Sequence, residues 1–183
     1  DSDGLGETCN LVRASATSVV ASKVDLSSRR DIETFWEGLS GSVPDVIVNN
    51  AGIYPFRDYL EVDQEFLDRI MDINLNSVFW MCQKFIEKRS KAGGVIINIS
   101  SIEALLPFKR DMAAYGMSKA GVISLTRSLA RDYGRSGFRA NVIVPGAIRT
   151  AGVERAAKAA IAQMDLGMMK TGYDFQARLP LGR

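Results

Sequence analysis

One tyrosine and one lysine, Tyr115 and Lys119, stand four residues apart in the stretch AAYGMSKAG. On a helix, this spacing places both side chains on the same face. An unperturbed tyrosine loses its proton only near pH ~10, but a neighbouring ammonium favours the phenolate. A tyrosine assisted in this way can exchange a proton with an alcohol oxygen near neutral pH. The alternative is a solvated surface pair, and only the rest of the chain can decide between the two.

The chain contains no histidine, which excludes several common kinds of site. A Ser-His-Asp triad, a Cys-His pair and a histidine-ligated zinc site all need that residue. Any proton transfer must therefore use Tyr, Lys, Asp, Glu or Cys.

The length and composition indicate one globular domain, since 183 residues, 46% of them hydrophobic, suffice for a substantial core. The net charge of +2, without a basic cluster, gives no case for binding nucleic acid. No apolar run is long enough to cross a membrane, and the two cysteines are too few for a disulfide framework. We therefore expect a cytoplasmic protein with no metal, no membrane contact and no nucleic-acid partner.

Short apolar runs alternate with amphipathic stretches along the chain, which indicates an α/β fold with a parallel sheet. The expected elements, in chain order, are a strand over 18–26, a helix from Ser27 or Ser28 to Gly41, a strand over 45–52, a helix from Asp63 to about Arg89, a strand over 94–100, a helix from about Met112 to Tyr133 and a strand over 139–146.

Polar residues and turn residues follow each predicted strand. They are Asp25, then Asn50 to Gly52, then Ser101, then Pro145 and Gly146. In parallel α/β sheets, ligands gather beyond the carboxyl ends of the strands. We therefore expect a binding site at this edge, close to Tyr115 and Lys119.

Four motifs carry a resemblance to a known family: VNNAG (48–52), INISS (97–101), YGMSK (115–119) and NVIVPGAIRT (141–150). Their order and spacing resemble those of the classical short-chain dehydrogenases/reductases. The resemblance implies a Rossmann-like, doubly wound parallel sheet with helices on both faces. The match extends over nearly the whole chain, and the four motifs together are far more specific than the Tyr/Lys pair alone.

The resemblance also implies catalytic roles. Tyr115 resembles the family's acid/base, and Lys119 resembles the partner that tunes it and holds the nicotinamide ribose. Ser101, rather than the adjacent Ser100, resembles the residue that stabilises the substrate oxygen. Asn74 resembles the asparagine that holds a water in the proton relay, although a tolerated helix residue is the simpler alternative.

Further positions resemble the family's contacts to an NAD(P) cofactor, in addition to Tyr115 and Lys119. They are Asp1, Asp25, Leu26, Asn50, Ala51, Gly52, Pro145, Gly146, Ile148 and Thr150. Asp1 takes the place of the acid that binds the adenosine ribose, which favours NAD over NADP. Plain turn residues at Asn50 and Gly52, a helix-capping Asp25 and a merely polar Asp1 remain as alternatives.

The resemblance is incomplete at both ends of the chain. The family's first two strands, its glycine-rich phosphate turn and its last strand have no counterpart, so we expect a single partial domain of a longer polypeptide. Residues 1–17 fit the end of a strand followed by its helix. The strand over 18–26 then lacks a neighbour, which leaves an edge of the sheet open. Residues 151–180 are expected to cover the site as a loop and helix.

These observations together predict an oxidoreductase that transfers a hydride between NAD(P) and a secondary alcohol or ketone with apolar bulk. An NADPH-dependent 3-oxoacyl-thioester reductase and a catalytically silent binding protein of the same fold are the alternatives. The resemblance also implies a homodimer or homotetramer, with the helices that carry Trp80 and Tyr115 packed between subunits.

Overall fold

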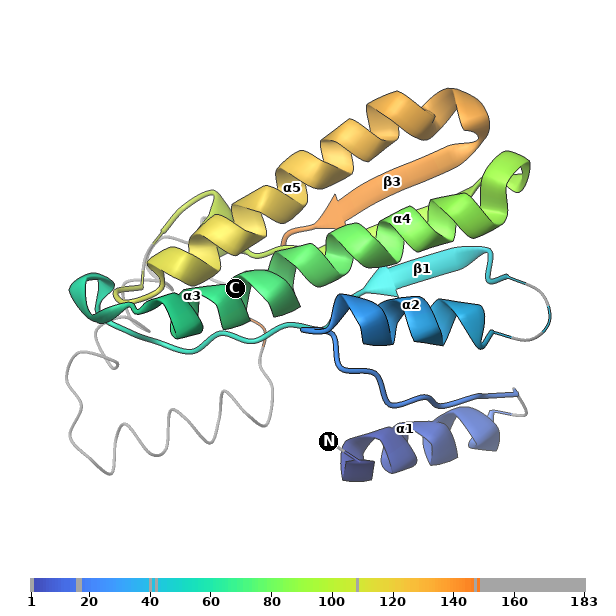
Figure 1. The fold of residues 1–183 in the computed structure, drawn as a ribbon, viewed down its shortest axis with the longest axis horizontal. Coiled ribbons are helices and arrows are strands. Elements are labelled where there is room, and N and C mark those ends of the chain that lie inside the picture. Colours follow the sequence, from blue (N-terminus) through green and yellow to red (C-terminus); the bar gives the residue numbers. More distant parts are fainter. Residues whose placement is uncertain are drawn as a thin grey trace.

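The computed structural model describes residues 2–15, 18–39, 41, 43–107, 109–146 and 148. Within these residues the sheet has three parallel strands in the order β1 (Val46–Asn49), β2 (Gly94–Ile99) and β3 (Phe138–Ile143) (Figure 1). In register, Ile47 lies opposite Ile96, which in turn lies opposite Ala140. The predicted α/β fold with a parallel sheet is thus confirmed, and the strands over 45–52, 94–100 and 139–146 are found where they were expected.

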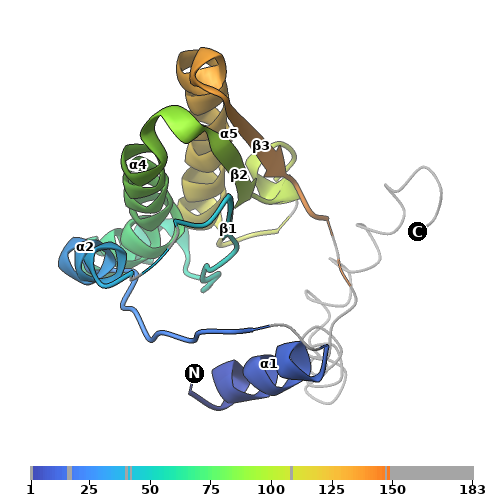
Figure 2. The same ribbon diagram turned by 90° about the vertical axis from the view of Figure 1, so that its right-hand side faces the viewer.

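Three helices cover one face of this sheet (Figure 2). Helix α4 (Ser77–Arg89) packs on β1 and β2, and α5 (Ala113–Tyr133) packs on β2 and β3. Helix α2 (Arg29–Glu37) lies against α4. No helix within the described residues is long and apolar enough to cross a membrane.

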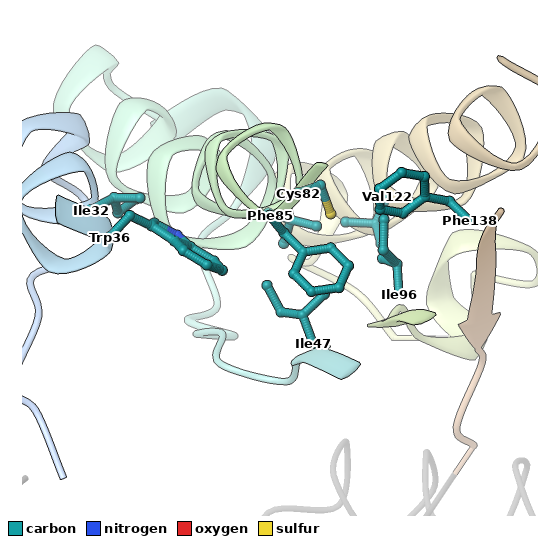
Figure 3. Packing of buried hydrophobic residues seen from close by; sticks show 9 residues of the cluster. Ile32, Trp36, Ile47, Cys82, Phe85, Ile96, Val122 and Phe138 are labelled. Atoms are coloured by element: carbon teal, nitrogen blue, oxygen red, sulfur yellow. The ribbon is translucent and has the colours of Figure 1, made fainter. Parts of the chain in front are cut away.

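The core lies between these helices and the sheet. Ile96 and Phe85 are fully buried at its centre, and Ile47 and Val122 join them from β1 and α5 (Figure 3). The opposite face of β1 is different, because Val46 is 48% exposed and Val48 is 55% exposed. The alternation of side chains along the strand places its buried and exposed valines and isoleucines on opposite faces.

The helix boundaries follow from side-chain caps. The Ser28 hydroxyl accepts a hydrogen bond from the Asp31 amide at the start of α2, and Asp63 does the same for Phe66 at the start of α3 (Gln64–Met71). Helix α2 ends at Glu37, with Gly38 as its C-cap, a few residues before the expected end at Gly41. Gly137, in the left-handed conformation at φ 83°, ends the 3₁₀ turn that follows α5.

The long helix expected over 63–89 forms, but a π-helical turn, η2 (Asp72–Asn76), interrupts it. The wider turn shifts the backbone pairing, so that the Ser77 amide donates to the Asp72 carbonyl. The Ser77 hydroxyl then donates to the Ile73 carbonyl at 2.6 Å. This buried hydroxyl therefore satisfies a carbonyl of the π turn, which is the segment that carries Asn74.

The prediction of a strand over 18–26 is wrong, because the structure has no strand at these residues. Residues 18–25 run extended but pair with no described strand, and Val20 is 91% exposed. The helix expected within residues 1–17 does form, as α1 (Ser2–Ala14). A β-rich sequence without a neighbouring strand has no partner for its backbone groups, so its propensity alone cannot make it a strand.

Candidate active site

The carboxyl ends of β2 and β3 are brought together by hydrogen bonds that continue beyond the strands. The Ser100 amide donates to the Ile143 carbonyl at 2.8 Å, and the Ile102 amide donates to the Pro145 carbonyl at 2.9 Å. The serine turn after β2 and the Pro145 turn after β3 therefore lie side by side. This is the edge at which the sequence predicts a binding site.

Tyr115 and Lys119 occupy the first turns of α5 above this edge. The Lys119 side chain is buried, and its ammonium donates a hydrogen bond to the Ile99 carbonyl at 2.9 Å. The same ammonium lies 6.0 Å from the centroid of the Tyr115 ring. Burial lowers the pKa of Lys119 because it removes the charged form from water. Lys119 is therefore not a solvated surface residue, and it lies beside a half-buried Tyr115, so the solvated surface alternative does not hold for the lysine.

Asn74 projects from the π turn and is completely buried. Its Oδ1 accepts from the Ile53 amide at 2.8 Å, and its Nδ2 donates to the Ile53 carbonyl at 2.8 Å. The carboxamide thus pairs with the loop after β1 much as a neighbouring strand would. It fixes that loop against the helix, which a merely tolerated helix residue would not do.

Gly52 lies where Asn74 and Lys119 approach each other. A Cβ added at this position would be 3.2 Å from Asn74 Oδ1 and 3.3 Å from Lys119 Nζ. Both distances are tighter than ordinary contacts between a carbon and a polar atom. Glycine therefore has a packing reason here, and the three predicted residues meet at one place.

Ser101 starts the short 3₁₀ turn η4 (Ile102–Ala104), and its Oγ accepts from the Glu103 amide at 3.3 Å. This turn packs on α5, where a Cβ at Gly116 would be 3.3 Å from the Glu103 carbonyl oxygen. Gly116 follows Tyr115 directly, so the Ser101 turn lies on the helical turn that carries the tyrosine. Glu103, within this turn, is buried, at 6% exposed.

A cavity of about 100 Å³ lies beside the carboxyl end of β1. Its walls are Leu26, Val48, Asn49, Asn50, Ala51, Ser77, Val78 and Met81. Leu26, Asn50 and Ala51 are the positions predicted for the adenosine side of a cofactor, and the mixture of aliphatic side chains and amides suits a flat heteroaromatic ring. The residues that line this cavity therefore fit the adenosine side of a dinucleotide. A larger depression, of about 640 Å³, lies at the opposite end of the sheet, around Tyr133 and Phe138.

Other predicted cofactor residues are less closely tied to this centre. Asp25 is exposed and accepts from both the amide and the hydroxyl of Ser27, at 2.9 Å and 2.7 Å. These hydrogen bonds lower the pKa of Asp25. The residue thus shapes the turn before α2, but it does not cap the helix, because the N-cap of α2 is Ser28. Gly146 and Ile148 are exposed, whereas Asp1 and Thr150 fall outside the described residues, as does the segment 151–180.

Several buried polar residues around the site were not predicted. Ser118 contacts Asn74, and the Ser100 hydroxyl donates to the Lys119 carbonyl at 2.8 Å. Asn98 joins Asn49 of β1 to Thr126 of α5, with contacts of 2.8 Å and 2.9 Å. The signal for Asn98 was present in the sequence, because an asparagine inside the apolar run GVIINIS needs partners to be buried.

Comparison with known proteins agrees with this geometry. A family model described as enoyl-(acyl carrier protein) reductase matches residues 2–171. Together with the parallel sheet and its covering helices, this defines an α/β protein with a Rossmann fold. The chain belongs to the short-chain dehydrogenase/reductase family.

Individual relatives are dehydrogenases. The chain is 34% identical over 154 residues to 3beta-hydroxysteroid dehydrogenase 1 of Eggerthella lenta, which covers 82% of this chain and 59% of that protein. It is 34% identical to L-rhamnose 1-dehydrogenase (NAD(P)(+)) of Azotobacter vinelandii, over 98% of this chain and 66% of that one. The chain thus spans less than two thirds of the length of these relatives.

Solved structures show the same fold. A 4-hydroxyisoleucine dehydrogenase complexed with NADH matches with a TM-score of 0.66 and 30% identity, over 75% of this chain and 62% of that one. A protein described as a short-chain dehydrogenase/reductase from Burkholderia xenovorans gives a TM-score of 0.83 at 27% identity, over 98% of this chain and 68% of that one.

Proposed function

We propose that the protein is an NAD(P)-dependent dehydrogenase or reductase that interconverts a secondary alcohol and a ketone, with Tyr115 as the acid/base. The observation that carries the proposal is the position of Lys119. Its buried ammonium is fixed by the Ile99 carbonyl and lies beside the Tyr115 ring. A cation held there favours the phenolate of the tyrosine, which is the form that can accept a proton from an alcohol.

The remaining residues complete the proton chemistry. In oxidation of an alcohol, the Tyr115 phenolate accepts the hydroxyl proton while Ser101 donates a hydrogen bond to the same oxygen. In reduction of a ketone, Tyr115 returns that proton to the oxygen. Asn74 holds the loop after β1 in place beside Lys119. The nicotinamide group, when bound, supplies or accepts the hydride.

The cofactor is held by the chain's own residues at the carboxyl edge of the sheet. Leu26, Asn50 and Ala51 line the cavity for its adenosine side, and Pro145 and Ile148 follow β3 toward the nicotinamide. In the proposal Gly146 and Thr150 take part in the same segment. Asp25 lies beside the adenine, and Asp1 takes the ribose hydroxyls and so favours NAD over NADP. The relative from Azotobacter vinelandii is described as using NAD(P)(+).

A second candidate is an NADPH-dependent 3-oxoacyl-thioester reductase. The description of the matching family model, which concerns an acyl-carrier substrate, favours it. The same Tyr115, Lys119 and Ser101 would serve that reaction, so the two candidates differ in substrate and cofactor. A silent binding protein is disfavoured, because such a protein has no need of a buried, carbonyl-bound lysine beside a tyrosine.

The wider setting is part of the proposal. Residues 151–180 form the proposed cover of the site, which accommodates a substrate with apolar bulk within a single partial domain over 1–183. The enzyme works as a homodimer or homotetramer in the cytoplasm. Two free cysteines, Cys9 and Cys82, are both buried, which suits a reducing compartment.

The test is Tyr115→Phe in the complete natural polypeptide, followed by the absorbance of the reduced nicotinamide. We expect kcat to fall by about 10²–10⁴-fold, the usual contribution of a general acid/base. Tyr133→Phe is the matched control, because Tyr133 lies at the far end of the same helix. A panel of secondary alcohols and 3-oxoacyl thioesters, each with both nicotinamide cofactors, separates the candidates. Undiminished turnover in Tyr115→Phe would refute the mechanism.

A further inference from the structure

Ser118 lies between Tyr115 and Lys119 in α5 and is completely buried. Its hydroxyl donates to the Tyr115 carbonyl at 2.7 Å, which is an ordinary contact for a serine in a helix. Its Oγ also accepts a hydrogen bond from Asn74 Nδ2 at 3.2 Å. This second contact crosses from α5 to the π turn, so Ser118 connects two elements that carry predicted catalytic residues.

The Asn74 carboxamide is held from two sides. One Nδ2 proton goes to the Ile53 carbonyl and the other to Ser118 Oγ, while Oδ1 accepts from the Ile53 amide. Both donors of the amide are therefore in use. The bonds to Ile53 set its contact with the loop after β1, and the bond to Ser118 sets its contact with α5.

The orientation of this carboxamide matters because of what lies next to it. Asn74 Oδ1 and Lys119 Nζ both lie close to the backbone of Gly52, since a Cβ added there would be 3.2 Å from the first atom and 3.3 Å from the second. A carboxamide that turned about its side-chain bonds would disturb the Gly52–Ile53 backbone and the space beside the ammonium together. Because Asn74, Ser118 and Lys119 are buried, hydrogen bonds lost in such a rotation would not be replaced by water.

We propose that Ser118 is a positioning residue of the active site: it acts through Asn74 to hold the Gly52–Ile53 turn against Lys119. The expected effect on turnover rests on the proposed function. The tether, by which we mean the hydrogen bond from Asn74 Nδ2 to Ser118 Oγ, is a property of the fold. The simpler alternative is that Ser118 only satisfies its own hydroxyl at the Tyr115 carbonyl. Experiments can distinguish these two roles of Ser118, because only the positioning role makes the effect of Ser118 depend on Asn74.

The kinetic test compares Ser118→Ala with Ser124→Ala in the complete polypeptide. Ser124 lies on the same helix but is exposed, so its replacement is a matched control. We expect Ser118→Ala to lower kcat by roughly tenfold with a change in the KM for cofactor of less than about twofold, because an unpaired buried donor is costly. The control should retain full kcat. Equal activity of the two variants would overturn the proposal.

A double-mutant cycle with Asn74→Ala tests the coupling. If Ser118 acts through Asn74, then adding Ser118→Ala to Asn74→Ala lowers kcat by less than about twofold more. A merely structural serine would give losses that multiply, and that outcome would contradict the tether.

A second readout does not depend on turnover. In ¹H–¹⁵N spectra, the Asn74 side-chain amide should show two inequivalent protons that exchange slowly with solvent. Ser118→Ala should shift one of them and speed its exchange by at least about tenfold, whereas Ser124→Ala should not. Ser118→Cys, which keeps a weak acceptor at the same place, should give an intermediate result and serves if the alanine variant fails to fold. An unchanged Asn74 amide would overturn the tether even if the protein proved to have no dehydrogenase activity, an outcome that would by itself refute only the proposed function.

Discussion

At the scale of single residues, Gly52 lies in close contact with two predicted site residues, Asn74 and Lys119. We expect Gly52→Ala to lower kcat by roughly tenfold and to cost about 1–2 kcal/mol of stability, as overpacking of a filled site typically does. The new methyl would press on Asn74 Oδ1 at 3.2 Å and on Lys119 Nζ at 3.3 Å. The lysine can yield at its flexible end, but the carboxamide is fixed by its bonds to Ile53. Steady-state kinetics and thermal melting measure both effects.

Gly134→Ala is the control for this substitution. A Cβ at Gly134 would meet nothing within 4 Å, and the residue sits in the right-handed region after α5. The change should be neutral or slightly stabilising, because alanine restricts the unfolded chain. If Gly52→Ala behaved like this control, the close approach of Asn74 and Lys119 to Gly52 would not matter for function.

At the scale of elements, a network of buried polar side chains connects β1 and β2 to α4 and α5. Asn49 of β1 donates to Asn98 of β2 at 2.8 Å, and Asn98 donates to Thr126 of α5 at 2.9 Å. Cys82 of α4 accepts from Asn49 at 3.3 Å. Each member finds a partner, so the network adds register between the elements without leaving a polar group unsatisfied.

The Cys82 thiol in this network makes stability depend on alkaline pH. Burial raises its pKa from 9.0 to about 12, and the hydrogen bonds with Asn98 and Asn49 oppose that shift only in part. Between these values the unfolded chain releases the thiol proton and the folded chain keeps it, so stability falls as pH rises. Between about pH 8 and about pH 10.5, the Cys82 contribution should fall by roughly 2 kcal/mol.

Urea unfolding of Cys82→Ala and Cys9→Ala at both pH values isolates this contribution. The Cys82 variant should lose less stability at alkaline pH than the Cys9 variant, whose Cys82 is intact. Lys119 acts in the opposite direction in both variants, because its lowered pKa lets stability rise with pH up to 10.5. Identical pH dependence in the two variants would show that the buried thiol ionises normally.

How far the sequence predicted these elements depends on whether the determining contacts are local. Helices α2, α3 and α5 were predicted because caps such as Ser28 and Asp63 and the helical spacing of apolar residues act within a few residues. The π turn at 72–76 was missed, since it depends on the pairing of Asn74 with a loop 21 residues away. The same limit applies to the site, where spacing paired Tyr115 with Lys119 but could not show that the Ile99 carbonyl fixes the ammonium.

At the scale of the whole molecule, the exposed apolar residues bear on assembly. Helix α4 carries Phe79 at 43% exposed, and α5 carries Met117 at 51% exposed. Trp80 lies on a helix expected to pack between subunits, and it is already covered in part by Arg29, whose guanidinium lies 4.1 Å from its ring centroid. Phe79 packs edge-on against Trp80 and presents its remaining surface outward. Phe79 is therefore the better candidate for a contact between copies of the chain.

We expect Phe79→Glu to shift the protein from a dimer or tetramer to a smaller species in light scattering coupled to gel filtration. A charge that is buried at an interface without a partner typically weakens the free energy of association by about 2–5 kcal/mol. Leu60→Glu is the control, because Leu60 is 90% exposed and belongs to neither helix but to the short 3₁₀ turn Tyr59–Glu61. The control should keep its mass. If Phe79→Glu also kept the full mass, with an unchanged melting temperature, then α4 would not form the contact.

Since α4 continues from the π turn that holds Asn74, loss of the assembly should also lower kcat, and dilution of the unmodified protein should reproduce that loss.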